Sequence, residues 1–172
     1  YVTGAYPIFF LKEVVSTLST ENKARVIVVT DACRAGKLAG NAIGGAQLSS
    51  QTLAQQFANE IKILSCQPNE YSIEGEQWGG GRGAFSYHLV EGLFGLADGN
   101  ADRSVNLLEI GRYLEDRVTN EVAPQSQVPM VVGNRSERLA AVVPELLAQV
   151  QKNKSGQLPQ FSPTDNRDIE AD

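Results

Sequence analysis

The order of hydrophobic and polar positions predicts helices alternating with buried strands. Residues 7–19 place apolar side chains at intervals of three and four, the spacing of an amphipathic helix. The runs RVIVVT (25–30) and EIKILSCQ (60–67) are continuous and largely apolar, as in parallel strands covered on both faces. A further helix is expected over 50–60. Helix, strand, helix and strand in this order predict right-handed crossovers onto one sheet.

The second half of the chain continues the mixed pattern. Residues 68–83, PNEYSIEGEQWGGGRG, contain a glycine cluster and are expected to be loop. QVPMVVG (127–133) predicts a short strand, and Pro129 favours an edge of the sheet because proline has no N–H to donate. Helical spacing returns in three segments, 84–97, 107–118 and 144–152. The expected fold class is α/β, with a mostly parallel sheet flanked by helices.

Composition limits the number of domains and the kinds of partner. A chain of 172 residues with 42% hydrophobic content suits one compact domain, which we place at 1–152. Residues 153–172 have the composition of a linker or disordered tail. The net charge of -5 argues against nucleic acid and against an anionic membrane surface as partner.

Apolar run lengths and cysteine usage bear on the compartment. No apolar run approaches the roughly 20 residues that a membrane-spanning helix needs. Two cysteines do not form a disulfide framework, so a reducing, cytoplasmic location is expected.

One of the two cysteines stands where catalytic groups gather in α/β proteins. Reactive side chains collect at the carboxyl ends of parallel strands, because the loops open there. Cys33 follows the strand 25–30 within DACRAG (31–36), where substrate and a base can reach a thiol. Taken alone, a cysteine such as Cys33 is more often a small packing residue than a nucleophile. Cys66, at the end of the next strand, is expected to be such a packing residue.

The DACRAG segment resembles the nucleophile segment of the caspase-like cysteine peptidases, which include metacaspases, paracaspases and bacterial relatives. Caspases carry Q-A-C-[RQG]-G at this place, and metacaspases carry D-x-C-H-S-G. The similarity continues through ILSCQPNEYSIE (63–74) and GRGAFSYHLVEGLFGLAD (81–98), so it covers about residues 7–135. It implies a caspase-like three-layer sandwich whose first strands are missing from this chain. A flavodoxin-like or receiver-like domain would explain the strands but not the motif.

This resemblance implies a cysteine endopeptidase mechanism. Cys33 would attack a peptide carbonyl and form an acyl-enzyme, with a histidine as base and then as acid. The family's histidine lies about 50 residues upstream of the cysteine, but none of the 32 residues before Cys33 is histidine. We expect it on an N-terminal part of the same protein. A catalytically inactive module that binds peptides or partner proteins is the alternative. His88, the only histidine present, is expected to be a packing residue.

Acidic residues suggest the specificity. In the family, the residue two before the nucleophile lines the pocket for the side chain next to the cut bond, and here it is Asp31. Metacaspases and paracaspases have Asp there and bind Arg or Lys, whereas caspases have Gln and bind Asp. Glu74 stands where caspases place a pocket arginine, and Glu70 and Glu76 are close enough to be confused with it.

Two carboxylates would pair with a guanidinium or ammonium group. We therefore expect cleavage of proteins or peptides after Arg or Lys, with Asp31, Ser72 and Glu74 binding substrate. Ser72–Glu74 would also pair with the substrate main chain as an added strand. Each acid alone could instead be a solvated loop charge. Arg34 and Lys37, just after Cys33, make self-processing possible in the same loop.

A second motif, DGNADRSVNLLE (98–109), resembles an EF-hand calcium loop. Arg103 occupies the sixth position, where glycine normally makes the turn, and its charge opposes a cation. We favour a polar capped turn and no cofactor, with calcium as the alternative. The residues at the ligand positions are Asp98, Asn100, Asp102, Ser104, Asn106 and Glu109.

Overall fold

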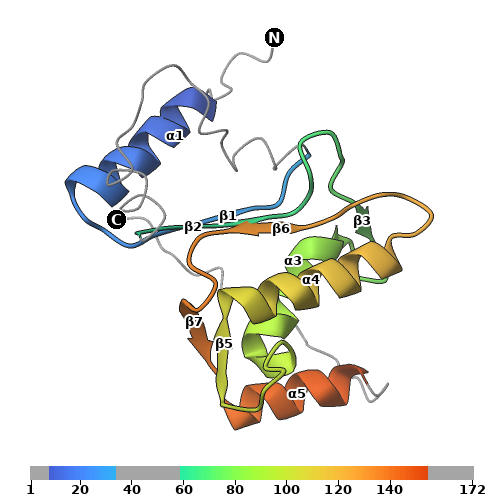
Figure 1. The fold of residues 1–172 in the computed structure, drawn as a ribbon. Coiled ribbons are helices and arrows are strands. Elements are labelled where there is room, and N and C mark those ends of the chain that lie inside the picture. Colours follow the sequence, from blue (N-terminus) through green and yellow to red (C-terminus); the bar gives the residue numbers. More distant parts are fainter. Residues whose placement is uncertain (1–7, 34–58, 155–172) are drawn as a thin grey trace, which may run out of the picture.

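The computed structural model describes residues 8–33 and 59–154 (Figure 1). Its main sheet has the order β1-β2-β6. β1 (Val26–Thr30) pairs in parallel with β2 (Glu60–Leu64), and β2 pairs in antiparallel fashion with β6 (Met130–Val132). Among the described strands β6 therefore lies at an edge, as Pro129 predicted. The result is a mixed α/β sheet flanked by helices, which confirms the expected fold class.

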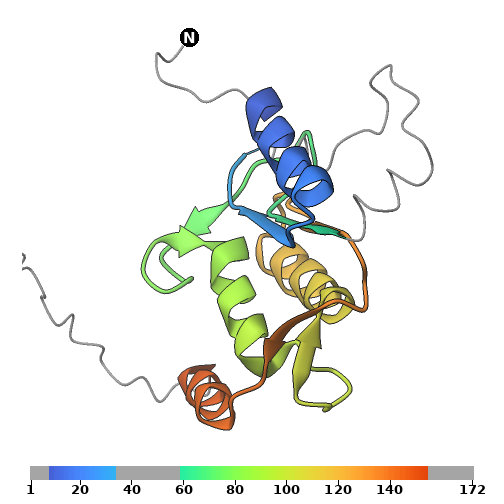
Figure 2. The same cartoon turned by 90° about the vertical axis from the view of Figure 1, so that its left-hand side faces the viewer.

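Helices cover both faces of this sheet. In Figures 1 and 2 the sheet runs between α1 (Ile8–Ser16) above and α3 (Ala84–Glu91) and α4 (Leu107–Glu121) below. Successive side chains of a strand point to opposite faces. Ile61 and Ile63 of β2 accordingly join the core under α3 and α4, while Leu64 packs with Leu11 of α1 on the other face.

The larger core is built on α4. Its buried side chains follow one another at three or four residues, so they form one stripe facing the sheet and α3. Asn106 caps the helix: its side chain accepts the N–H of Glu109, and the Glu109 carboxylate accepts the N–H of Asn106, both at 3.0 Å. The fully buried residues of the stripe are Leu107, Ile110, Leu114 and Val118.

Shorter elements connect these layers. A π-helical turn, η1 (Thr17–Glu21), follows α1, and another, η3 (Gly92–Leu96), follows α3. Gly95, with φ of 122°, ends that segment in a conformation that side chains disfavour. The helix α5 (Pro144–Lys154) lies at the end of the molecule far from α1 (Figure 2).

Two small sheets depart from the expected elements. The predicted loop 68–83 contains a hairpin of β3 (Glu74–Gly75) and β4 (Arg82–Gly83), turned through three glycines with positive φ. Within the EF-hand-like motif, β5 (Ser104–Asn106) pairs with β7 (Arg138–Ala141). Strands this short leave no periodic signal in sequence, and β5 and β7 are in addition more than 30 residues apart.

The exposure of β1 also differs from expectation. Ile27 and Val29 are 45% and 51% exposed, although their strand was expected to be covered on both faces. The register pairs them with Ile61 and Ile63, so they lie on the α3 and α4 face. Within the described residues, that helical layer covers β2 and leaves β1 open.

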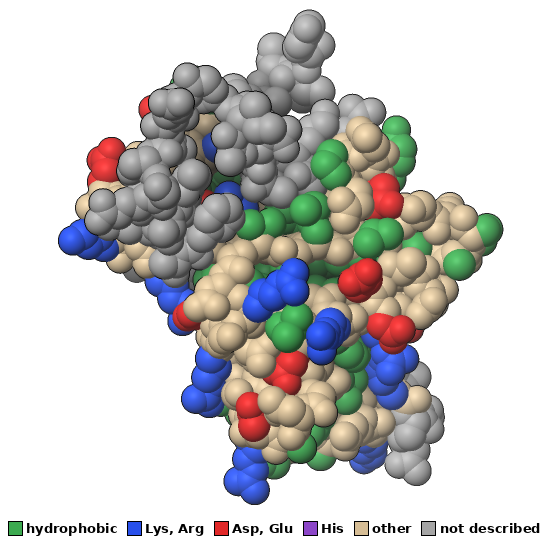
Figure 3. Space-filling view, in the orientation of Figure 1, with side chains coloured by type: hydrophobic (Ala, Val, Ile, Leu, Met, Phe, Trp, Pro, Cys, Tyr) green, Lys and Arg blue, Asp and Glu red, His purple; other side chains and the backbone are tan. Residues whose placement is uncertain are grey.

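Several expectations fall outside the described residues. They are the loop after Cys33 with Arg34 and Lys37, most of the helix over 50–60, and the tail from residue 155. None of the described helices has the length and apolarity to cross a membrane. On the face seen in Figure 3, acidic and basic side chains are interspersed and do not form one large basic area.

Replacing Gly92 with alanine should destabilise the fold. In most helices alanine is better than glycine by about 1 kcal/mol. Here, however, a β-carbon would lie 2.5 Å from Ile110 Cδ1 and 2.9 Å from Tyr113 Cδ1. Because Ile110 is fully buried, we expect the free energy of unfolding in urea to fall by about 1–3 kcal/mol.

Gly99→Ala is the matched control. A β-carbon at Gly99 would meet a single atom, at 4.0 Å, so this variant should stay within about 0.5 kcal/mol of the wild type. Equal stabilities of the two variants would contradict the close packing of α3 on α4.

Candidate active site

The backbone just before Cys33 is held by the end of β2. Ser65 is fully buried, and its hydroxyl accepts the N–H of Ala32 and donates to the Ala32 carbonyl, each at 3.2 Å. The N–H of Ser65 also donates to the Thr30 carbonyl at 3.0 Å. Cys33 itself is exposed and carries a free thiol. The nucleophile candidate therefore projects from an anchored backbone into solvent.

The other cysteine has the packing position expected for it. Cys66 is fully buried and packs in the small core with Leu64. Its sulfur lies 3.4 Å from the Ala32 carbonyl oxygen and 3.5 Å from that of Glu70. The two thiols thus differ in accessibility, and only that of Cys33 can be reached by a peptide.

Asp31 lies where three segments meet. The hydroxyl of Ser72 donates to Asp31 Oδ1, and the hydroxyl of Ser86 donates to Oδ2. A β-carbon on Gly83 would collide with Oδ2, so the backbone of β4 lies directly against this carboxylate. Two of the predicted substrate-binding residues, Asp31 and Ser72, are therefore in contact.

Glu74, the third predicted substrate-binding residue, lies one strand away. It is exposed and pairs with Gly83 across the β3–β4 hairpin. The carbonyl of the preceding Ile73 accepts the N–H of Ala84 at 2.9 Å. The hairpin therefore places Glu74 beside the Gly83 backbone on which Asp31 lies.

A buried glutamine supports the loop that carries Ser72. Gln127 is fully buried, and its Oε1 accepts the N–H of Ile73 at 2.9 Å. Its Nε2 donates to the Ser65 carbonyl at 2.9 Å and lies 3.4 Å from Ser72 Oγ. Neither Gln127 nor Ser86 was predicted as a site residue from the sequence. A single polar side chain just before a strand or in the first turn of a helix has no distinctive sequence pattern.

Glu70 has a structural position, which separates it from Glu74. Its carboxylate accepts the N–H groups of Gln67 at 3.0 Å and Val128 at 2.7 Å, and the hydroxyl of Ser126 at 2.6 Å. Burial acts to raise the pKa of Glu70, but these hydrogen bonds outweigh it and hold the pKa below its usual value. Glu70 thus joins the loop after β2 to the segment before β6.

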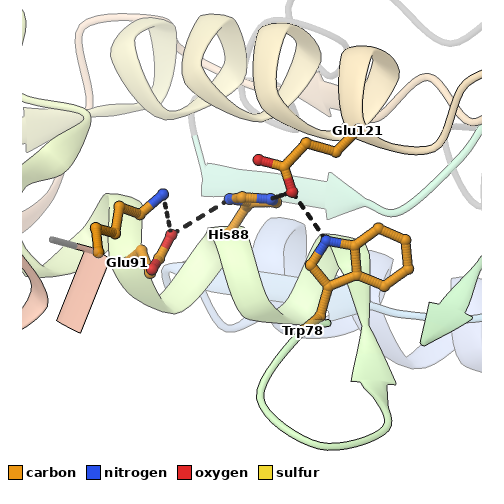
Figure 4. Close-up of polar contacts among 5 residues, drawn as sticks. Trp78, His88, Glu91 and Glu121 are labelled. Atoms are coloured by element: carbon orange, nitrogen blue, oxygen red, sulfur yellow. Dashed lines mark hydrogen bonds and ion pairs between the residues drawn. The ribbon is translucent and has the colours of Figure 1, made fainter. Parts of the chain in front are cut away.

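His88 is a buried packing residue, as expected (Figure 4). It is fully buried, with Nε2 2.9 Å from Glu121 Oε2 and Nδ1 3.3 Å from Glu91 Oε2. The indole N–H of Trp78 donates to the same Glu121 oxygen at 2.9 Å. Both ring nitrogens face these carboxylates, so His88 is not placed to act as the base for Cys33.

The carboxylates around His88 are favoured in their charged form. Burial acts to raise the pKa of Glu91, but contacts with His88, Lys154 and Tyr87 outweigh it and lower that pKa. For Glu121, burial is likewise outweighed by hydrogen bonds from Trp78 and His88, and its pKa is lowered. Lys154 of α5 lies 2.8 Å from Glu91 Oε2. Burial and Glu91 together raise the pKa of Tyr87 to about 12.

The EF-hand-like turn uses its oxygens within the protein. Asp98 accepts the N–H groups of Asp102 and Arg103, and Asp102 accepts the N–H and hydroxyl of Ser104. Ala101 and Arg103 have positive φ values of 59° and 65°. The described part of the chain holds no group of three or more His, Cys, Asp or Glu residues suited to a metal ion. A polar capped turn without a cofactor stays the prediction for this segment, with calcium as its alternative.

Comparison with known proteins gives one match. The family model described as Caspase domain matches residues 2–166, which is most of the chain. No curated protein and no solved structure matches it.

The cluster around His88 should make stability depend on acid pH. Because the folded-state pKa of Glu121 lies below its unfolded value of 4.5, its contribution is present above that pH and is lost as pH falls through the folded pKa. We expect the wild-type free energy of unfolding to decrease from about pH 5 to pH 3. Glu121→Gln should show a shallower decrease in urea unfolding across this range.

Glu115→Gln provides the comparison on the same helix. Glu115 is exposed and has no ion pair or hydrogen bond with the described residues, so this variant should keep the wild-type slope. A Glu121→Gln slope equal to that of the wild type would contradict the charged state assigned to the cluster.

Proposed function

Since the chain belongs to the caspase domain family, we propose that it is a cysteine endopeptidase domain that cuts after Arg or Lys with Cys33 as its nucleophile. Membership in this family makes it a caspase-like peptidase domain, and a peptidase domain acts on protein or peptide substrates. One observation carries the finer proposal. An exposed thiol follows a parallel strand, two residues after a carboxylate held by two hydroxyl groups.

The chemistry proposed for Cys33 is acyl transfer. Its thiolate attacks the carbonyl carbon of the cut bond, and the Cys33 N–H stabilises the resulting oxyanion. The amine then leaves with a proton from a histidine, and the acyl group stays on sulfur as a thioester. The same histidine removes a proton from water, which attacks the thioester and releases the acid and the thiolate.

The base has to come from outside the described residues, because His88 is buried against Glu91 and Glu121. We assign it to a histidine on an N-terminal part of the same protein. Support comes from β1, where Ile27 and Val29 leave an apolar face uncovered by the described residues. In this proposal, a segment of that N-terminal part packs on this face and brings the base to the end of β1.

Specificity for a basic side chain is proposed from charge. Asp31 and Glu74 are both exposed carboxylates beside the β3–β4 hairpin. An arginine or lysine side chain entering between them would form charge-assisted hydrogen bonds. In this proposal, Ser72–Glu74 lie beside the substrate main chain as an added strand. Ile73 keeps its bonds to Gln127 and Ala84, so the pairing groups are those of Ser72 and Glu74.

The second candidate function is a caspase-like module that binds peptides without cutting them. The burial of His88 against Glu91 and Glu121 favours it, because the described residues then offer no histidine as base for Cys33. The two candidates share Asp31 and Glu74 and differ only in turnover.

Cys33→Ala should abolish cleavage. We expect the full-length protein to hydrolyse fluorogenic peptides ending in Arg or Lys, and the variant to lose all turnover above background, because no other described thiol is exposed. Cys66→Ala removes the buried thiol, and it should retain activity in proportion to its folded fraction, measured by circular dichroism.

Wild-type protein that binds these peptides without cutting them would favour the non-catalytic module. Turnover unaffected by Cys33→Ala would refute the assignment of the nucleophile.

Self-processing is a further part of the proposal. Arg34 and Lys37 follow Cys33 directly and are basic residues of the kind that the site would accept. We expect intact-mass spectrometry to find wild-type fragments that end at Arg34 or Lys37, and only the uncut chain in Cys33→Ala. Identical termini in the two proteins would rule out self-cleavage.

A further inference from the structure

The carboxylate of Asp31 is restrained on both of its oxygens. Ser72 donates to Oδ1 and Ser86 donates to Oδ2, and these serines come from different elements. Ser72 lies in the loop between β2 and β3, and Ser86 in the first turn of α3. Rotation of the carboxylate about its terminal bond would break both hydrogen bonds. The plane of the group is therefore set by two separate parts of the fold.

The backbone of β4 restricts the carboxylate further. A β-carbon at Gly83 would collide with Asp31 Oδ2, which shows that the chain approaches this oxygen closely. Ser86 and Gly83 are only three residues apart. The start of α3 therefore supplies both the hydroxyl that donates to Asp31 and the backbone that limits the movement of its carboxylate.

Gln127 orients the hydroxyl on the other oxygen. Its amide is held at both ends by 2.9 Å hydrogen bonds, from the Ile73 N–H to Oε1 and from Nε2 to the Ser65 carbonyl. The remaining Nε2 proton points to Ser72 Oγ at 3.4 Å. Because Ser72 Oγ accepts there, its own proton is directed to Asp31. The contact is long, but the amide that makes it is fully buried and cannot turn to water.

A carboxylate fixed in this way suits arginine better than lysine. Each carboxylate oxygen has two acceptor positions, so a hydroxyl on each oxygen leaves one position free on each. A guanidinium group binds through two parallel N–H donors and requires both oxygens in one defined plane, whereas an ammonium group is a point charge without that requirement. When the plane of the Asp31 carboxylate is fixed before binding, less conformational entropy is lost on binding a guanidinium group, which requires that plane, whereas an ammonium group gains nothing from it.

We propose that Ser86 and Gln127 are positioning residues that hold the Asp31 carboxylate for a guanidinium group and thereby make the site prefer arginine to lysine. This inference rests on the proposed function, and it adds two residues that touch neither the substrate nor the reacting atoms.

The test compares two peptides that differ only in arginine or lysine before the cut bond. We expect the full-length wild type to have the higher kcat/KM for arginine. Ser86→Ala should lower kcat/KM for the arginine peptide about tenfold, because the unrestrained carboxylate then has to be ordered when the substrate binds. The lysine peptide should change about threefold or less. Ser86→Thr keeps the hydroxyl and should restore the wild-type ratio.

Gln127→Met keeps the side-chain volume but removes the amide. Like Ser86→Ala, it should lower the ratio of kcat/KM for the arginine peptide to that for the lysine peptide, through KM more than through kcat. Ser136→Ala is the control, because the exposed Ser136 makes no side-chain hydrogen bond with the described residues, and its N–H donates to Asn134 Oδ1. The ratio of the two peptides is independent of the fraction of folded protein, so a merely structural effect would leave it unchanged.

A second arm measures binding in place of turnover. The dissociation constants of the arginine and lysine peptides are compared for the Cys33→Ala protein and for Cys33→Ala combined with Ser86→Ala or with Gln127→Met. This arm needs no turnover, so it applies to a catalytically inactive module as well. Equal losses for both peptides in either arm would overturn the roles of Ser86 and Gln127 and leave the peptidase proposal intact. Absence of turnover with an intact preference in binding would overturn the peptidase proposal alone. Absence of turnover together with equal binding of the two peptides would overturn the peptidase proposal and the roles of Ser86 and Gln127.

Discussion

The hydrogen bonds between Ser65 and Ala32 determine where the candidate site lies. They extend the parallel pairing of β1 and β2 one step past the last paired residues, Thr30 and Leu64. Asp31 and Cys33 stand on either side of the anchored residue, so both are presented at one strand end. β1 ends at Thr30, and the chain bends at Ala32 and turns at Cys33, so the carboxylate and the thiol both follow directly from one anchored strand end.

Buried polar groups then connect this strand end to the rest of the molecule. Gln127 ties the loop of Ser72 to the end of β2, and Glu70 ties that same loop to the segment before β6. Each of these two side chains makes three hydrogen bonds, which offset the cost of removing it from water and fix its geometry. The His88 cluster lies elsewhere and joins α3 to α4 and the hairpin loop of Trp78. These residues join separate elements of the fold through hydrogen bonds and ion pairs.

Much of this arrangement could be predicted from the chain alone. The stripe on α4, the apolar runs of β1 and β2 and the edge position signalled by Pro129 all depend on neighbours close in sequence. Local signals also pointed to Cys33 and to the buried state of Cys66. The short strands β5 and β7 and the exposure of Ile27 were not predicted, because each depends on which distant segment lies alongside. Hydrophobic pattern records that a residue favours burial, but not whether another element covers it.

What the sequence by itself determined is the set of elements and the strand end at which Asp31 and Cys33 stand, since periodicity and the residues after an apolar run are local properties. Only the tertiary structure decided which hydroxyls meet the Asp31 carboxylate and that His88 faces Glu121 and not the thiol. Ser86 and Asp31 are 55 residues apart, and no local pattern relates them. Their contact exists because the start of α3 packs beside the end of β1. The physical reason is that hydrogen bonds are short and directional, so partners are selected by packing in three dimensions.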